Sequence, residues 1–200
     1  SDNAGSRAWR NFARKSHTVR GEVNIAVVGK YFNTGDFTLS DSYLSVIEAI
    51  KYSAYAVGKK PVLTWISAVD FETKKKSLKE LSKYDGILVP GGFGSRGVEG
   101  LLKVIEYART HKIPYFGICY GMQLLVIEYA RNVLGFKDAN THEVNPKAKH
   151  IIIDIMEDQK EKVATKKLGG SMRLGAFPAR LTKGTVAYSA YGTTEISERH

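Results

Sequence analysis

Four short apolar runs punctuate the first 120 residues of the chain. They occupy residues 23–29, 61–66, 86–89 and 114–118 and are rich in valine, isoleucine and leucine. Near-continuous runs of this length are typical of parallel strands that are covered on both faces. We therefore expect four buried strands of one parallel sheet.

Amphipathic segments fill most of the intervals between these runs. Ser40 or Asp41 can cap a first helix that Gly58 ends, and further helices are predicted over 78–84, 98–110 and from residue 120 onward. The positions predicted to share an apolar face are Tyr43, Leu44, Ile47 and Ile50 in the first helix, and Leu124, Leu125, Ile127 and Ala130 in the last. The alternation predicts an α/β fold with a doubly wound, mostly parallel central sheet flanked by helices, of the flavodoxin-like kind.

The two ends of the chain differ from this pattern. Residues 1–6 are small and polar like an expression-tag remnant, and residues 7–20 are basic, with Trp9 and Phe12 placed to dock one side of a short helix. We interpret 1–20 as such a remnant followed by an interdomain linker, and 21–200 as one domain. Residues 150–156 and 172–181 look like antiparallel pieces.

The composition argues against several classes of partner and environment. The net charge of +10 invites a nucleic-acid hypothesis, but the charges are scattered and the run Lys74-Lys75-Lys76 has no interleaved aromatic residues, so no nucleic-acid partner is expected. No apolar run approaches the ~18 residues of a spanning helix, so no membrane association is expected. A single cysteine forms no internal disulfide, and a cytoplasmic setting follows as the simplest expectation.

That cysteine, Cys119, lies at a predicted strand-to-helix corner between Gly117 and Gly121. The pattern is typical of a nucleophile elbow, in which small neighbours let one reactive side chain stand clear of the backbone. A helix N-terminus also favours the thiolate over the thiol. The alternative is a small buried hydrophobic residue, the commonest fate of a lone intracellular cysteine.

A second glycine-rich segment, 90–97, follows the third predicted strand. Because parallel strands deliver their carboxyl ends to one edge of a sheet, this segment and the elbow should face the same crevice. Attack on a carboxamide needs donors for an oxyanion, which the amide after Cys119 and the Gly91-Gly92 turn can supply. The segment has no Gly-Lys-Ser/Thr ending, so a phosphate-binding loop is not indicated, and a simple tight turn is the alternative.

Five segments, taken in order, resemble the glutaminase domain of the CTP synthase family. The glycine loop and the cysteine elbow are shared by glutamine amidotransferases in general, whereas the Gly-Gly-Ser-Met-Arg-Leu-Gly run at 169–175 and the Glu-Arg-His ending point to this member. The likeness extends from about residue 23 to residue 200. The matching segments are 90–100, 117–123, 138–140, 169–175 and 198–200.

The resemblance implies hydrolysis of L-glutamine to glutamate and ammonia through a thioester on Cys119. It implies an oxyanion hole made by the amides of Gly92 and Tyr120. Glu143 corresponds to the carboxylate that receives the substrate's α-ammonium, although residues 140–144 read Asn-Thr-His-Glu-Val where the family usually has Asn-Ser-Thr-Glu-Phe. The implied substrate-binding residues are Gly92, Phe93, Tyr120, Gly121, Met122, Gln123 and Glu143.

The partners follow from the same resemblance. Ammonia is expected to pass to a separate amidoligase domain that converts UTP to CTP with ATP and Mg²⁺. Nothing in these 200 residues resembles that domain, and this domain itself is expected to need no cofactor or metal. The full-length protein is expected to be a homo-oligomer.

A cysteine nucleophile needs a histidine base and a group that orients it. In the family these are the histidine and glutamate of a downstream His-Pro-Glu run, which this sequence lacks, so the domain is expected to be incomplete at its C-terminus. Another glutamine amidotransferase, or a non-catalytic binding module of the same fold, remains an alternative. The histidines present are expected to be structural or solvent-facing, with His142 the first to examine as a substitute base: His17, His111, His142, His150 and His200.

Overall fold

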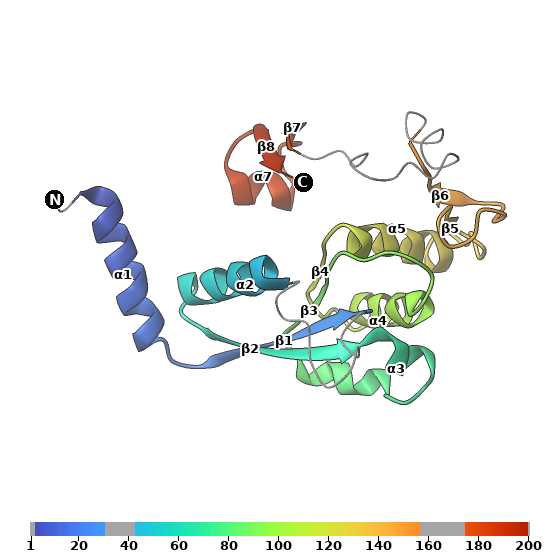
Figure 1. The fold of residues 1–200 in the computed structure, drawn as a ribbon, viewed down its shortest axis with the longest axis horizontal. Coiled ribbons are helices and arrows are strands. Elements are labelled where there is room, and N and C mark those ends of the chain that lie inside the picture. The colour runs from blue at the N-terminus through green and yellow to red at the C-terminus, as the bar shows by residue number, and fades with distance from the viewer. Residues whose placement is uncertain (1–2, 31–42, 157–174, 200) are drawn as a thin grey trace. The chain divides into compact units, whose positions relative to one another are not determined.

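The computed structural model describes residues 3–30, 43–156 and 175–199 (Figure 1). The chain forms two compact units, Ser1–Asp154 and Ile155–His200. The predicted functional residues that the structure describes all belong to the first unit.

A four-stranded parallel sheet forms the centre of the first unit. Its strands are β1 (Glu22–Gly29), β2 (Lys60–Ser67), β3 (Gly86–Val89) and β4 (Tyr115–Gly117), arranged in the order β2-β1-β3-β4. The chain passes from β1 to one neighbour and then returns to build β3 and β4 on the other side. This reversal is the topological switch of a doubly wound sheet, so the predicted fold class is confirmed.

Helices connect these strands, and most were expected. One was not predicted: α3 was missed because five residues are too few to show a helical period. The short helix predicted over 78–84 is η2, a 3₁₀-helix that begins with a Ser77–Glu80 capping box. The proposed caps Ser40 and Asp41 lie outside the described residues. The helices given by the described residues of this unit are α1 (Ala4–Thr18), α2 (Leu44–Ala56), α3 (Ala68–Glu72), η2 (Leu78–Lys83), α4 (Val98–Thr110) and α5 (Tyr120–Asn132).

Strand alternation divides the core between the two faces of the sheet. Val27 and Leu88 point to the face covered by α2, where Tyr43 completes a small cluster. Their strand neighbours point to the opposite face and join a larger core with residues of α3, α4 and α5. Leu44 was expected on the buried side of α2 but is exposed, because the face that packs on the sheet runs through Val46 and Ile50 instead.

Helix α1 packs against α2 through aromatic rings. Trp9 and Phe12 stack with centroids 6.0 Å apart, and Phe12 lies 5.0 Å from Tyr52 of α2. The expectation that both rings use one side of a helix is confirmed. The helix begins at Ala4, and Asn3 caps it by accepting the amide of Ser6, so the structured region begins inside the segment set aside as a remnant.

The C-terminal pairings differ from the expected ones. Strand β6 (Ile151–Ile153) pairs in parallel with β5 (Asn140–Thr141), which is two residues long and shows no apolar pattern. In the second unit β7 (Ala176–Arg180) pairs in antiparallel fashion with β8 (Glu195–Arg199), and α7 (Val186–Tyr191) lies between them in sequence. The antiparallel arrangement therefore involves residues near the C-terminus, rather than 150–156.

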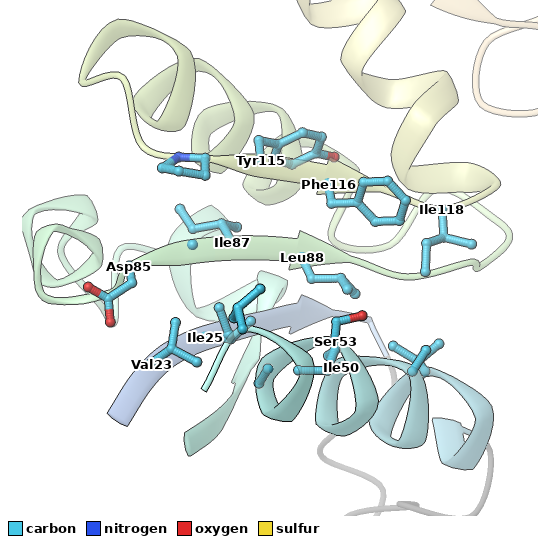
Figure 2. Close-up of a pocket in the computed structure, with 16 residues that line it drawn as sticks. Val23, Ile25, Ile50, Ser53, Asp85, Ile87, Leu88, Tyr115, Phe116 and Ile118 are labelled. Atoms are coloured by element: carbon cyan, nitrogen blue, oxygen red, sulfur yellow. The ribbon is translucent and has the colours of Figure 1, made fainter. Parts of the chain in front are cut away.

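An apolar cavity of about 560 Å³ lies between α2 and the strands β3 and β4. Figure 2 shows Leu88, Phe116 and Ile118 on the strand side and Ile50 with Ser53 on the helix side. Phe116 is 65% exposed because α2 covers only part of this face of the sheet. Cys119 does not line this cavity.

Candidate active site

Cys119 occupies the corner between β4 and α5, as the N-cap of the helix. Its backbone has φ 51° and ψ −105°, a conformation that residues with a side chain rarely adopt, and the residue is exposed. Strain of this kind concentrates at functional sites, where the surrounding packing enforces it. The predicted elbow is therefore present, and the alternative of a buried structural cysteine is wrong.

The two flanking glycines make this corner possible. A Cβ on Gly117 would lie 2.5 Å from the carbonyl carbon of Gly121, and a Cβ on Gly121 would lie 2.2 Å from the carbonyl oxygen of Val89. The Tyr115 hydroxyl also donates to the Gly121 carbonyl at 2.8 Å, and burial raises the pKa of this tyrosine. Backbone contact, rather than flexibility, explains why glycine stands at both positions.

The glycine-rich loop lies beside the elbow. Val89 and Gly117 are register partners at the ends of β3 and β4, so the segments that follow them leave the same edge of the sheet. A Cβ on Gly91 would lie 3.6 Å from the Cβ of Cys119. The two segments therefore lie side by side at one edge of the sheet, as expected, and the crevice that they should share remains a prediction.

Two carboxylates hold the loop through its amides. Glu143, which follows β5, accepts from the Gly94 N–H at 2.7 Å. Glu72, at the end of α3, accepts from the Gly97 N–H at 3.0 Å, where Gly97 caps α4 with φ 77°. Glu143 therefore contacts the loop through a backbone amide, and its binding of the substrate's α-ammonium remains a prediction.

Lys30, which sequence reasoning missed, lies in the same place. It directly follows β1, is only 8% exposed, and donates to the Phe93 carbonyl at 2.7 Å and to the Gly94 carbonyl. Desolvation lowers its pKa, while the negative charges of Glu143 and Glu72 act in the opposite direction. A lysine immediately after a buried strand that ends at the ligand edge was the signal available in the sequence.

Tyr120 connects the elbow to the loop. Its side chain is buried, its hydroxyl donates to the Gly94 carbonyl at 2.9 Å, and its ring lies 4.9 Å from the Lys30 ammonium nitrogen. The carboxyl ends of β1, β3 and β4 thus supply one cluster of Lys30, the glycine loop and the elbow.

The other predicted substrate residues lie on the loop or on the first turn of α5. Gly92 and Gly121 are buried, whereas Phe93 is 60% and Met122 53% exposed. Gln123 is half-buried, and its backbone N–H donates to the Cys119 carbonyl at 3.1 Å. The structure brings these positions together, and their individual roles remain predictions. The run at 169–174 lies outside the described residues.

Three of the histidines that the structure describes pair with other groups, and His17 lies in α1. His111 stacks on Tyr107 at the far end of α4, and the Nδ1 atom of His142 lies 3.0 Å from a carboxylate oxygen of Asp154. His150 pairs with Asp138 at 2.5 Å and, by hydrogen bonding, lowers the pKa of that carboxyl group. In the part of the chain that the structure describes, no histidine hydrogen-bonds Cys119. His200 is outside that part.

Among the residues that the structure describes, no group of three or more histidine, cysteine, aspartate or glutamate side chains is arranged to hold a metal ion. Nor does any helix in the described ranges have the length and apolar character needed to cross a membrane.

Similarity to curated proteins is high. The chain is 47% identical over 192 residues to a CTP synthase of Sulfurisphaera tokodaii, covering 96% of this chain and 35% of that protein. It is 49% identical over 193 residues to a CTP synthase of Geobacter sulfurreducens, covering 96% of this chain and 34% of that protein. The chain thus spans about a third of the length of these relatives.

A solved structure of a related protein has a similar fold. The glutaminase domain of Trypanosoma brucei CTPS with bound acivicin superposes with a TM-score of 0.77 at 35% identity, covering 89% of this chain and 66% of that one. Residues 38–193 match the family described as glutamine amidotransferase class-I. With the cysteine elbow and its facing glycine loop, these matches show that the chain belongs to the class-I glutamine amidotransferase family and is homologous to CTP synthase glutaminase domains.

Proposed function

We propose that this chain is the glutaminase part of a CTP synthase and releases ammonia from L-glutamine at Cys119. The observation that supports it most is the elbow: an exposed cysteine at φ 51° beside a glycine loop, in a chain 45–49% identical to CTP synthases. Neither another glutamine amidotransferase nor a non-catalytic module is favoured by these relatives.

The chemistry begins at the thiolate. Its sulfur attacks the side-chain carboxamide carbon of glutamine, and the carbonyl oxygen becomes an oxyanion that the amides of Gly92 and Tyr120 would receive. Collapse breaks the C–N bond, the nitrogen leaves as ammonia after gaining a proton, and a γ-glutamyl thioester remains. Water then attacks the thioester, which restores the thiol and releases glutamate.

Glu143 is proposed to hold the substrate's α-ammonium. In this structure its carboxylate accepts the Gly94 amide, which places the negative charge against the loop. A cation arriving with the substrate offers it a stronger, charge-assisted partner. Substrate binding would therefore act on the same carboxylate that positions the loop.

The ammonia is proposed to pass to an amidoligase domain, which converts UTP to CTP with ATP and Mg²⁺, in a ligase that is homo-oligomeric at full length. The identity of the relatives supports this assignment. The general base remains a prediction, because three of the described histidines, His111, His142 and His150, pair with other groups.

Replacing the nucleophile tests the proposal. In the full-length protein, Cys119→Ala should abolish glutamine-dependent ammonia release and labelling by a glutamine-mimicking electrophile. CTP formation from added ammonium should be largely retained, because that reaction belongs to the other domain. Ammonia release that survives the substitution would rule out Cys119 as the nucleophile.

A further inference from the structure

Building on the glutaminase function proposed above, we propose that Lys30 is a positioning residue for that reaction: its ammonium clamps the carbonyls of Phe93 and Gly94 and thereby keeps the glycine-loop amides directed at Cys119. Lys30 does not touch the thiol. It acts through the loop backbone, from the end of a strand, β1, that carries none of the predicted catalytic groups.

One peptide plane shows the clamp directly. The Phe93 carbonyl and the Gly94 N–H belong to the same planar unit and point in opposite directions. Lys30 binds the carbonyl at 2.7 Å, and Glu143 binds the N–H at 2.7 Å. A cation on one side and an anion on the other thus fix the orientation of this plane, which cannot rotate without breaking two charge-assisted hydrogen bonds.

The next carbonyl along the loop extends the clamp to the elbow. The Gly94 carbonyl accepts from Lys30 and, at 2.9 Å, from the Tyr120 hydroxyl. Tyr120 follows Cys119, and its own amide is the predicted partner of Gly92 in the oxyanion hole. Lys30 therefore joins the two segments that must supply one donor each.

The loop needs such a restraint because of its composition. Gly91, Gly92 and Gly94 lack the Cβ that normally limits backbone rotation, and Gly94 adopts φ 76°. Oxyanion stabilisation depends on donors already aimed at the developing charge. A glycine-rich segment provides close approach but little rigidity of its own, so the rigidity has to come from Lys30, Glu143 and Tyr120.

The burial of Lys30 indicates that its side chain is held in one position. The residue is 8% exposed, and burying its charge carries a desolvation cost that its hydrogen bonds and the nearby charges of Glu143 and Glu72 oppose. A surface lysine would have stayed in water.

The test compares Lys30→Met with Lys30→Arg in the full-length protein. Glutamine hydrolysis gives kcat and KM, and mass spectrometry of the Cys119 peptide gives the rate of alkylation by iodoacetamide. In this alkylation the Cys119 thiolate attacks the saturated carbon of iodoacetamide and displaces iodide, so no oxyanion forms. The alkylation rate therefore reports on the thiol and the elbow but not on the oxyanion hole. Lys83→Met is the matched control, because this exposed lysine also lies over a tyrosine ring, at 5.2 Å, but precedes β3.

Lys30→Met should lower kcat by about 10²-fold or more, the scale of losing one oxyanion donor. Its alkylation rate should stay within about threefold of wild type, a difference too small to reflect lost activation of the thiol. Lys30→Arg keeps the charge and several N–H donors and should recover about tenfold or more of the lost kcat. Lys83→Met should match wild type in both assays.

A kcat for Lys30→Met within about threefold of wild type, the protein being folded, would overturn the proposal, since the loss of one donor costs far more. So would a parallel fall of kcat and alkylation, which would mean that Lys30 merely maintains the elbow. If Lys30→Met does not fold, Lys30→Gln, which is polar but uncharged, is judged by the same two rates. The Cys119→Ala test separates failure of this proposal from failure of the proposed function. If Cys119 is not the nucleophile, ammonia release survives that substitution, whatever the Lys30 variants show.

Discussion

At the scale of single residues, close backbone contact sets the identity of the amino acids around Cys119. Gly117 and Gly121 bring the turn before the cysteine against the first turn of α5, and Gly121 also rests on Val89 of β3. No side chain fits at either position without moving main chain. The strained φ of Cys119 is the result of this packing.

Gly121→Ala should therefore destabilise the fold. Its new Cβ would meet the Val89 carbonyl oxygen at 2.2 Å, and overpacking against backbone should lower the free energy of unfolding by about 1–3 kcal/mol. Urea denaturation measures this, with Gly91→Ala as the control, because a Cβ there meets its nearest neighbour at an ordinary 3.6 Å. Equal losses in the two variants would show that contact distance is not the cause.

At the scale of elements, a buried ion pair joins α4 to α5, the two helices that follow the glycine loop and the elbow. Glu128 of α5 is fully buried, accepts three hydrogen bonds from Arg109 of α4, at 2.7 to 3.1 Å, and also accepts from Asn132. Hydrogen bonding to Glu128 raises the pKa of Arg109. The pair lies toward the ends of the helices remote from Cys119.

Arg109→Met should cost roughly 3 kcal/mol of unfolding free energy, at the low end of the range for breaking buried pairs, because Arg109 is partly exposed while Glu128 is not. Chemical denaturation gives the value. The double variant Arg109→Met/Glu128→Leu should regain much of the loss by removing the uncompensated charge. Lys51→Met, which breaks an exposed pair with Glu48, should lower stability far less, because solvent screens that pair. A single-variant loss no larger than that of Lys51→Met would contradict this account.

At the scale of the whole molecule, the buried core belongs to the first unit. All members of both buried clusters lie between Ala26 and Ile127. None of the described residues of the second unit, 155–156 and 175–199, is buried, and the secondary structure within these ranges is a two-stranded sheet with one short helix. Such a hairpin is marginal by itself.

Residues 1–154 alone should therefore melt cooperatively, whereas residues 155–200 alone should show no cooperative transition. Thermal unfolding followed by far-ultraviolet circular dichroism checks both fragments under one set of conditions. Cooperative melting of the 155–200 fragment would show that its stability does not require a buried core of the usual kind.

The sequence by itself determined the elements whose signal is local. Continuous apolar runs predicted the four strands of the main sheet, and helical spacing predicted α4 at its observed bounds. Gly117 and Gly121 predicted the elbow, because the steric demand of that turn falls on residues two positions from the cysteine. These features depend on neighbours in the chain, so composition and spacing reveal them.

Tertiary structure alone decided which distant residues meet. Lys30 and Glu143 are 113 positions apart, and only the strand order β2-β1-β3-β4 and the placement of β5 bring both to the same peptide plane of the glycine loop. Likewise, Glu128 interrupts an apolar helix face and is accommodated only because Arg109 faces it from α4. Long-range electrostatic pairing leaves no periodic trace in a single sequence, since its geometry exists only after the sheet and helices have packed.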